Sequence, residues 1–191
     1  MRAALLDGST ARDAALHSVH RVIVSELTGI ACDVDEFILR DMTIAYCTGC
    51  FECWVRTPGI CKATDAGHDV ARAVIRSDLA VFLTPITFGG YSSELKKGLD
   101  HLIGLISPFF MKANGETHHK PRYSTYPRLI GVGVLPGPDS ESEQIFTTLV
   151  GRNALNLHAP AHAAGVIRSG DSREAVGEAI RSLLAAAGVD H

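Results

Sequence analysis

Short apolar runs alternate with segments of helical periodicity along this chain of 191 residues, and this alternation constrains the fold more than any other feature. The apolar runs at 2–6 and 79–84 are expected strands, and the second one suits a strand buried on both faces. Apolar residues at helical spacing predict a helix over 14–28, with Gly29 as its C-cap, before an alternating strand at 32–39. Such alternation is typical of a parallel β-sheet covered by helices on both faces.

The same alternation continues through the rest of the chain. We expect further helices over 69–77, 93–105, 142–155 and 172–187, and further strands over 129–135 and 161–167. Residues 107–128 are polar and irregular, and their length predicts a lid or a contact loop. The pattern contains no repeat and no second domain, so we expect a single α/β domain over residues 1–191.

The five expected strands, with helices between them, match a doubly wound parallel sheet with the strand order 2-1-3-4-5. In this order the direction of winding reverses at strands one and three, and ligands bind outside the carboxyl ends of those strands. These ends are the turn at Gly8 and the loop over 85–91. The sequence therefore predicts a binding crevice between two glycine-containing loops.

The composition argues against several classes of partner. Hydrophobic residues make up 46% of the chain and charged residues 20%, and the formal net charge is -3 without a conspicuous cluster of Lys and Arg. Nucleic acids and anionic membrane surfaces are therefore poor partners. No apolar run approaches the ~20 residues that span a bilayer, and residues 1–6 lack the three-part form of a signal peptide. We expect a cytoplasmic protein.

The turn Gly8-Ser9-Thr10 lies between the first expected strand and the first expected helix. Backbone N–H groups at a helix N-terminus, together with neighbouring hydroxyl groups, form a favourable site for a phosphate group. A plain connection between a strand and a helix has the same residue types, so the turn by itself leaves both interpretations open.

The second loop follows the buried strand at 79–84 and reads Pro85-Ile86-Thr87-Phe88-Gly89-Gly90-Tyr91. Its glycines let the backbone approach a flat ring closely, and its two aromatic side chains can cover such a ring. Its backbone amides can also bind the polar edge of a flavin. The alternative is a surface turn with ordinary aromatic residues.

Most of the cysteines fall in one short segment. The segment contains Cys47, Cys50, Cys53 and Cys61, four of the five cysteines in the chain. In a reducing compartment such a group indicates a metal, a cluster cofactor or redox chemistry before it indicates structural disulfides. Four thiolates can ligate a [4Fe–4S] cluster, while zinc and metal-free thiols are the alternatives. The remaining Cys32, on the second expected strand, is interpreted as a small core residue.

On these residues, the chain resembles the iron-sulfur flavoprotein branch of the NADPH-dependent FMN reductase family, within the flavodoxin-like superfamily. The resemblance rests on the Gly8-Ser9 turn, the cysteine segment with residues 54–59, and residues 85–96, in matching order over nearly the whole length. It implies a flavodoxin-like fold in which the first loop holds the phosphate of FMN and the second surrounds its isoalloxazine ring. The implied FMN-binding residues are Gly8, Ser9, Thr10, Arg12, Pro85, Ile86, Thr87, Phe88, Gly89, Gly90 and Tyr91.

The same resemblance implies that Cys47, Cys50, Cys53 and Cys61 ligate a [4Fe–4S] cluster. Relatives have Pro-Arg and then Asn, Ser or Thr after the Gly-Ser pair, whereas this chain continues Thr10-Ala11-Arg12-Asp13. Arg12 can serve a phosphate dianion. Asp13 would repel the phosphate if its side chain pointed toward it.

The implied activity is that of an oxidoreductase. NAD(P)H reduces FMN, which then passes electrons to a quinone, another flavin, an azo or nitro compound, or a metal ion. No side chain is predicted as a catalytic acid or base, because the protein supplies position and electrostatics to the cofactor. The alternatives are an FMN and [4Fe–4S] electron carrier between protein partners such as ferredoxin, and a flavin-free structural module. Members of the family form dimers or tetramers, so we expect a homodimer or homotetramer.

Overall fold

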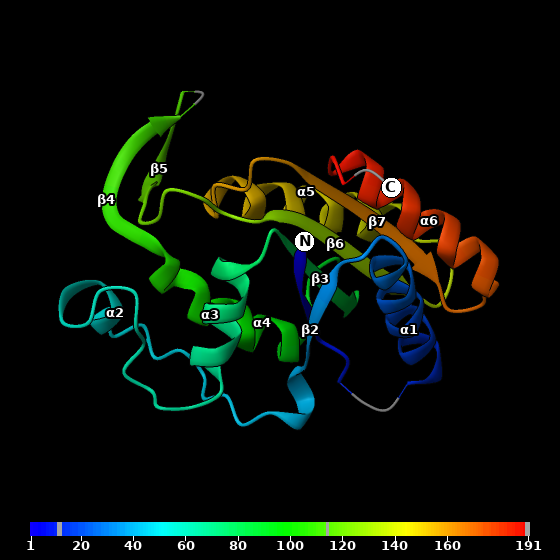
Figure 1. Cartoon of the computed structure of the whole chain (residues 1–191), viewed down its shortest axis with the longest axis horizontal. Coiled ribbons are helices and arrows are strands. Elements are labelled where there is room, and N and C mark those ends of the chain that lie inside the picture. Colours follow the sequence, from blue (N-terminus) through cyan, green and yellow to red (C-terminus); the bar gives the residue numbers. More distant parts are fainter. Residues whose placement is uncertain (11–12, 114, 190–191) are drawn as a thin grey trace.

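The computed structural model describes residues 1–10, 13–113 and 115–189, and its centre is a parallel β-sheet (Figure 1). Its strands are β1 (Arg2–Asp7), β2 (Asp33–Ile38), β3 (Leu79–Pro85), β6 (Arg128–Leu135) and β7 (His162–Arg168). Their spatial order is β2-β1-β3-β6-β7, and every neighbouring pair is parallel. The flavodoxin-like architecture and the predicted strand order are confirmed.

Helices cover both faces of this sheet because its strands place successive side chains on opposite sides. Ala3 and Leu5 of β1 face the side packed by α1 (Ala14–Gly29) and α6 (Arg173–Ala186). Ala4 and Leu6 face the other side, whose helices are α3 (Gly67–Arg76), α4 (Ser93–Asp100) and α5 (Ser140–Asn156). The buried apolar residues therefore form one core layer on each face.

Two helix ends differ from the sequence predictions. Gly29 is the last residue of α1 and not its cap, and the left-handed backbone conformation falls at Ala31, with φ of 55°. The Cys32 N–H then donates to the Leu27 carbonyl at 3.1 Å, which closes the helix end. The helix expected over 93–105 ends at Asp100 and continues as a short 3-10 helix, η2 (His101–Leu105).

The segment expected to be an irregular loop over 107–128 is largely a β-hairpin, which corrects that prediction. Strands β4 (Ile106–Ala113) and β5 (Glu116–Pro121) pair antiparallel and project from the main sheet (Figure 1). Its outward side chains include Phe109 and Phe110, while His118 turns inward and its Nδ1 lies 3.2 Å from Oδ1 of Asn156 on α5. The polar residues of β5 and a register shift in β4 hide the alternation that would have predicted these strands.

The long connection from β2 to α3 contains two short helical turns, η1 (Leu39–Asp41) and α2 (Glu52–Val55). Trp54 anchors the second turn, since its indole N–H donates to the carbonyl oxygens of Ile103 and Ile106, each at 3.0 Å. Over the described residues, no helix is both long enough and apolar enough to cross a membrane.

Candidate functional site

The two glycine-containing loops predicted to form a crevice do lie together at the carboxyl ends of β1 and β3. The Gly8 N–H donates to the Leu83 carbonyl at 2.8 Å, and the Ser92 hydroxyl donates to the Gly8 carbonyl. A side chain at Gly8 would meet Ser92 Oγ at 2.9 Å and the Leu95 Cα at 3.1 Å. The absence of a side chain at Gly8 is therefore what lets the first loop pack on the start of α4.

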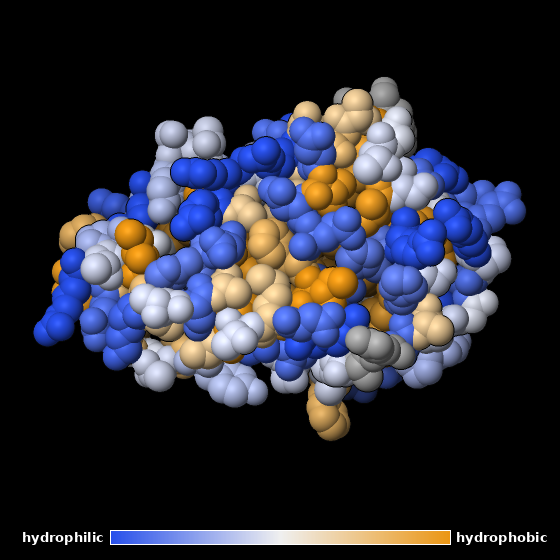
Figure 2. Space-filling model, turned by 60° about the horizontal axis from the view of Figure 1, so that its bottom comes forward, coloured by the Kyte–Doolittle hydropathy of each residue, from blue (hydrophilic) through white to orange (hydrophobic). Residues whose placement is uncertain are grey.

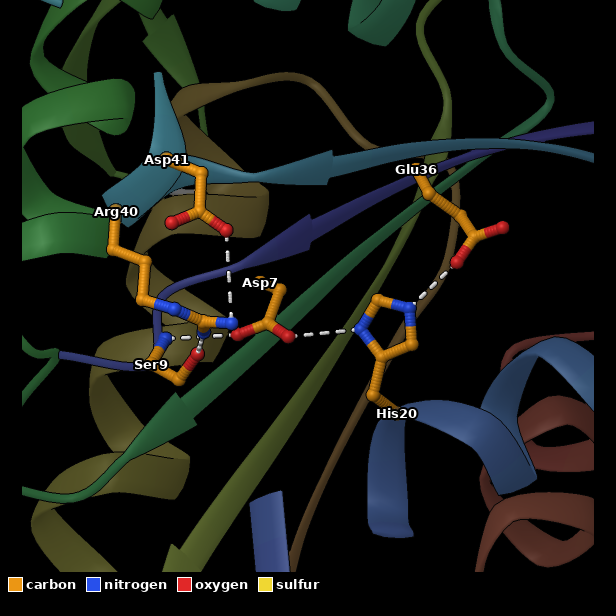
Figure 3. Close-up of polar contacts among 6 residues, drawn as sticks. All are labelled: Asp7, Ser9, His20, Glu36, Arg40 and Asp41. Atoms are coloured by element: carbon orange, nitrogen blue, oxygen red, sulfur yellow. Dashed lines mark hydrogen bonds and ion pairs between the residues drawn. The ribbon is translucent and has the colours of Figure 1, made fainter. Parts of the chain in front are cut away.

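A buried histidine bridges two carboxylates directly below the first loop (Figure 3). Nδ1 of His20, on α1, lies 2.8 Å from Oδ2 of Asp7, the last residue of β1. Nε2 of the same ring lies 2.6 Å from Oε2 of Glu36, on β2. The other Asp7 oxygen accepts the Ser9 N–H at 2.8 Å. A ring with a carboxylate at each nitrogen is best satisfied as the doubly protonated imidazolium.

The pKa values of this group follow from its contacts. Burial alone would raise the pKa of Asp7, but the hydrogen bonds from His20 and Ser9 outweigh it, so the pKa of Asp7 is lowered. The hydrogen bond to Asp7 raises the pKa of His20 against the opposing effect of burial, and Glu36 adds to that rise. Asp7 and His20 therefore form a buried charge pair at the base of the loop.

An arginine that the sequence analysis did not single out reaches the same loop. Arg40 belongs to η1, and its guanidinium donates through Nη1 to the Ser9 hydroxyl (Figure 3). Its Nη2 lies 3.8 Å from Oδ2 of Asp41, and its Nε is buried without a hydrogen-bond partner among the described residues. The parallel register, in which Asp7 of β1 pairs with Ile38 of β2, brings Arg40 beside the turn that follows Asp7.

The predicted phosphate-binding residues are only partly placed as expected. Gly8, Ser9 and the exposed Thr10 form the turn, whereas Arg12 lies outside the described residues. The Asp13 carboxylate is the N-cap of α1, and it accepts the N–H groups of Ala15 at 2.7 Å and Leu16 at 3.2 Å. Asp13 is thus bound to the helix N-terminus, where an anion would otherwise find those donors.

The second loop is closed by a tight turn. Thr87 and Gly90 exchange backbone hydrogen bonds of 3.0 and 2.9 Å, so these two N–H groups are used by the turn itself. The residues between them, Phe88 and Gly89, have φ of 50° and 73°, as a type I′ turn requires. The Phe88 side chain is 100% exposed at the tip of this turn.

Tyr91 is placed differently from the prediction that it covers a ring at the loop surface. Its ring packs edge-on against Phe82 of β3 and Phe146 of α5. Its hydroxyl accepts a hydrogen bond from Nδ2 of Asn153 at 2.9 Å, and burial raises its pKa to about 12. Tyr91 therefore holds the end of the loop onto the core.

The four clustered cysteines line one wall of a cavity of about 960 Å³. This cavity lies between the cysteine segment, α4, α5 and the hairpin, and it reaches the predicted flavin loop through Gly90 and Tyr91. Cys47 and Cys50 are exposed, Cys61 is half-buried and Cys53 is buried. Across residues 1–10, 13–113 and 115–189, no group of at least three His, Cys, Asp or Glu side chains is arranged to hold a metal ion.

The thiols in this wall differ in acidity. A hydrogen bond from the backbone of Glu52 lowers the pKa of Cys50, and the Thr48 hydroxyl and Lys62 act in the same direction. Burial raises the pKa of Cys53, and the neighbouring thiols, Cys61 first, raise it further. The remaining Cys32 is buried in the core, as predicted, and burial raises its pKa.

Comparison with known proteins places these features in a family. Residues 1–124 match the model of the family described as NADPH-dependent FMN reductase. A search of curated proteins by sequence finds no match.

Solved structures with the same fold extend over the whole chain. An NAD(P)H:quinone oxidoreductase from Methanothermobacter marburgensis has a TM-score of 0.72 at 12% identity, over 100% of this chain and 98% of that chain. An FMN-dependent NADH-azoreductase from Bacillus anthracis, solved with FMN, has a TM-score of 0.59 at 10% identity, over 100% of both chains. An NADH:FMN oxidoreductase has a TM-score of 0.62 at 14% identity, over 97% and 85%. At these identities the likeness shows the fold.

Proposed function

Because the chain belongs to the NADPH-dependent FMN reductase family and is an NAD(P)H-dependent FMN reductase, we propose that it binds FMN in the crevice between its first two loops. The observation that carries this proposal is the direct bonding of the Gly8 turn to the end of β3 and to Ser92, at the reversal of strand order. When bound, FMN accepts a hydride from NAD(P)H and passes electrons to an acceptor.

The residues of the crevice have different roles in this proposal. Ser9 and Thr10 face the phosphate end, and the backbone from Ile86 to Gly90 borders the ring. Phe88, which is fully exposed at the tip of its turn, covers the ring and excludes water from it. The buried Asp7 and His20 pair keeps the first loop in one conformation by holding the Ser9 N–H. None of these side chains serves as a general acid or base.

We propose a small aromatic or quinoid molecule as the electron acceptor. Proteins of the same fold include a quinone oxidoreductase and azoreductases, whose names describe acceptors of this kind. Ferredoxin-like protein partners, nitro compounds and metal ions remain the alternatives predicted from the sequence. Either nicotinamide cofactor, NADH or NADPH, fits the proposal.

A homodimer or homotetramer is the proposed assembly. The face in Figure 2 carries a band of apolar side chains between polar ones. Large apolar side chains are exposed at several loops and on the hairpin, including Tyr46, Val55, Phe88, Phe109 and Phe110. A band of exposed apolar side chains such as that in Figure 2 is typical of protein interfaces, and a second copy of the chain is the partner that the resemblance implies. The cytoplasmic location stays a prediction.

A [4Fe–4S] cluster is not part of the proposed electron path. The four thiols share a cavity wall, but their described arrangement does not bring three ligands to one point. The same geometry does not favour a zinc ion with four cysteine ligands. Iron, zinc and acid-labile sulfide analysis of protein purified without oxygen tests this statement, and four iron atoms per chain would contradict it.

The proposal is tested by adding FMN to the apoprotein and then following oxidation of NADPH or NADH with a quinone present. We expect quenched flavin fluorescence on binding and oxidation of the nicotinamide that requires both FMN and quinone. Bound flavin without nicotinamide oxidation would support the electron-carrier alternative. A chain that binds no flavin after incubation with FMN would overturn the proposal.

A further inference from the structure

The hydrogen-bond donors around the first loop are mostly committed to the protein's own carboxylates. The Ser9 N–H is held by Asp7, and the first free N–H groups of α1 are held by Asp13. In other strand-to-helix turns such donors are the ones that bind a phosphate group. An anion that enters this loop therefore has to find a different partner.

Arg40 is that partner on geometric grounds. Its Nη1 donates a hydrogen bond to the Ser9 hydroxyl. Its Nη2 lies 3.8 Å from Oδ2 of Asp41, the nearest carboxylate oxygen. Its Nε is buried and without a partner in the described chain, while the side chain as a whole is 20% exposed. A guanidinium stays charged at all relevant pH values, and a buried donor without an acceptor is costly. The Nε–H group of Arg40 therefore lacks an acceptor that an anionic ligand would supply.

The carboxylate below the loop does not supply this acceptor. Both Asp7 oxygens are already used, one by the Ser9 N–H and one by His20 (Figure 3). The described residues contain no ion pair between Arg40 and Asp7, even though both lie at the same turn. Because His20 balances the charge of Asp7, the ion pair of Arg40 in the described residues is its 3.8 Å contact with the exposed Asp41, and its Nε is left for a ligand.

We propose that Arg40 binds the phosphate monoester of FMN, with the Ser9 hydroxyl fixing the orientation of its guanidinium. The planar fork of an arginine matches two oxygens of a phosphate group, and the location at the end of β1 places it at the reversal of strand order. This inference rests on the proposed function. NADPH also carries a phosphate monoester, so the experiment has to separate the two sources.

The test compares FMN with riboflavin, which lacks the phosphate, by quenching of flavin fluorescence on the apoprotein. In Arg40→Met we expect the Kd for FMN to rise about tenfold or more, because a charged hydrogen-bonded partner is lost. The Kd for riboflavin should change less than about twofold, because its ring contacts are unaltered. Arg21→Met, which removes an exposed arginine of α1, is the matched control and should leave both values unchanged.

Arg40→Lys keeps the charge but removes the fork, so we expect a smaller loss of FMN affinity with riboflavin again unaffected. This variant also keeps the test valid if Arg40→Met does not fold, as judged by circular dichroism. Equal weakening of FMN and riboflavin would overturn the inference and make Arg40 a structural residue. If an Arg40 variant has a raised KM for NADPH but not for NADH, with FMN binding unchanged, the inference is also overturned. Arg40 would then bind the phosphate monoester of NADPH.

The failure of this inference can be told from the failure of the proposed function. If the unaltered chain binds neither flavin, the proposed function is wrong and the assignment of Arg40 is wrong with it. If the unaltered chain binds both flavins with equal affinity, the function stands, and Arg40 has no role in phosphate binding.

Discussion

The turn after β1 and the cysteine segment are the two regions that suggest chemistry, and they differ in how their polar atoms are arranged. Around the turn, short hydrogen bonds join Asp7, Ser9, His20, Glu36 and Arg40, which come from two strands, two helices and the turn itself. In the cysteine segment, thiols of unequal burial line a cavity without a group of three that could hold a metal, over the described residues. The cysteine segment is thus the more conspicuous motif in the sequence, but its side chains are arranged less closely around one point than those of the turn.

Ligand-type residues in a short segment therefore do not by themselves form a site. The turn draws its atoms from elements that the sheet holds in fixed register, so its donors and acceptors meet, with the exception of Nε of Arg40. The cysteines come from one long connection whose regular parts are the two short helical turns η1 and α2. Strands and helices position a functional group more narrowly than a long connection does.

The largest expected effect tests the packing of the first loop. In Gly8→Ala the new methyl group would overlap Leu95 of α4 and Ser92 Oγ, and part of this contact is backbone that cannot rotate away. We expect a loss of about 3 kcal/mol in the free energy of unfolding, measured with urea. Gly49→Ala in the cysteine segment meets open space, and its positive φ should cost only about 1 kcal/mol. Equal losses would remove the contrast between the two regions.

The second prediction concerns the bridging histidine. His20→Gln removes the charged partner of buried Asp7, and we expect a loss of about 2 kcal/mol in unfolding free energy. His17→Gln, which changes an exposed histidine of the same helix, should have little effect. A His20 variant as stable as its control would show that the Asp7 and His20 pair contributes nothing.

The same pair predicts how this loss depends on pH. The pKa of His20 is raised above its ordinary 6.5, so its contribution is complete below pH 6.5 and disappears as the pH rises through the folded value. The pKa of Asp7 is lowered below its ordinary 3.8, so its contribution is present above pH 3.8 and disappears as the pH falls through the folded value. The difference between His20→Gln and the unaltered chain should therefore be greatest between these limits, and a difference that grows at alkaline pH would contradict this.

A smaller effect is expected from the cap of α1. Asp13→Ala should cost about 1 kcal/mol of stability by freeing the Ala15 and Leu16 N–H groups. The freed donors and the lost negative charge should also tighten FMN binding. Asp139→Ala removes the equivalent cap of α5, so it should lower stability similarly and leave the Kd for FMN unchanged. Weaker FMN binding in Asp13→Ala would show that the carboxylate helps to shape the phosphate site.

The smallest effects are expected in the cysteine segment. Cys47 and Cys50 are exposed, so changing both to Ser should alter stability by less than about 0.5 kcal/mol and leave the flavin spectrum unchanged. Cys53→Ser, at a buried position, should destabilise the chain more than either exposed change. Loss of bound iron or of flavin absorbance in the double variant would restore the cluster interpretation.

The fold was largely predictable because buried parallel strands leave continuous apolar runs, and helices leave their own periodicity. The hairpin β4–β5 was missed because β5 is short and polar, and because the register of β4 shifts between Ile106 and Phe110. The nearness of the Gly8 turn to the loop at Pro85 followed from strand order alone. The positions of Tyr91 and Asp13 could not be predicted in this way. Tyr91 bonds to Asn153 and Asp13 caps the start of α1, and the local sequence does not specify either partner.

The sheet order, the helices on its two faces and the loops that meet at its edge were all predictable from the sequence, because these depend on patterns within single elements. Only the tertiary structure brought His20, Glu36 and Arg40 to the turn that follows Asp7. These residues lie on α1, β2 and η1, and they meet because the register of β1 against β2 sets which side chains share one level. A hydrogen bond depends on distances of a few tenths of an ångström, and such distances are decided by packing between elements.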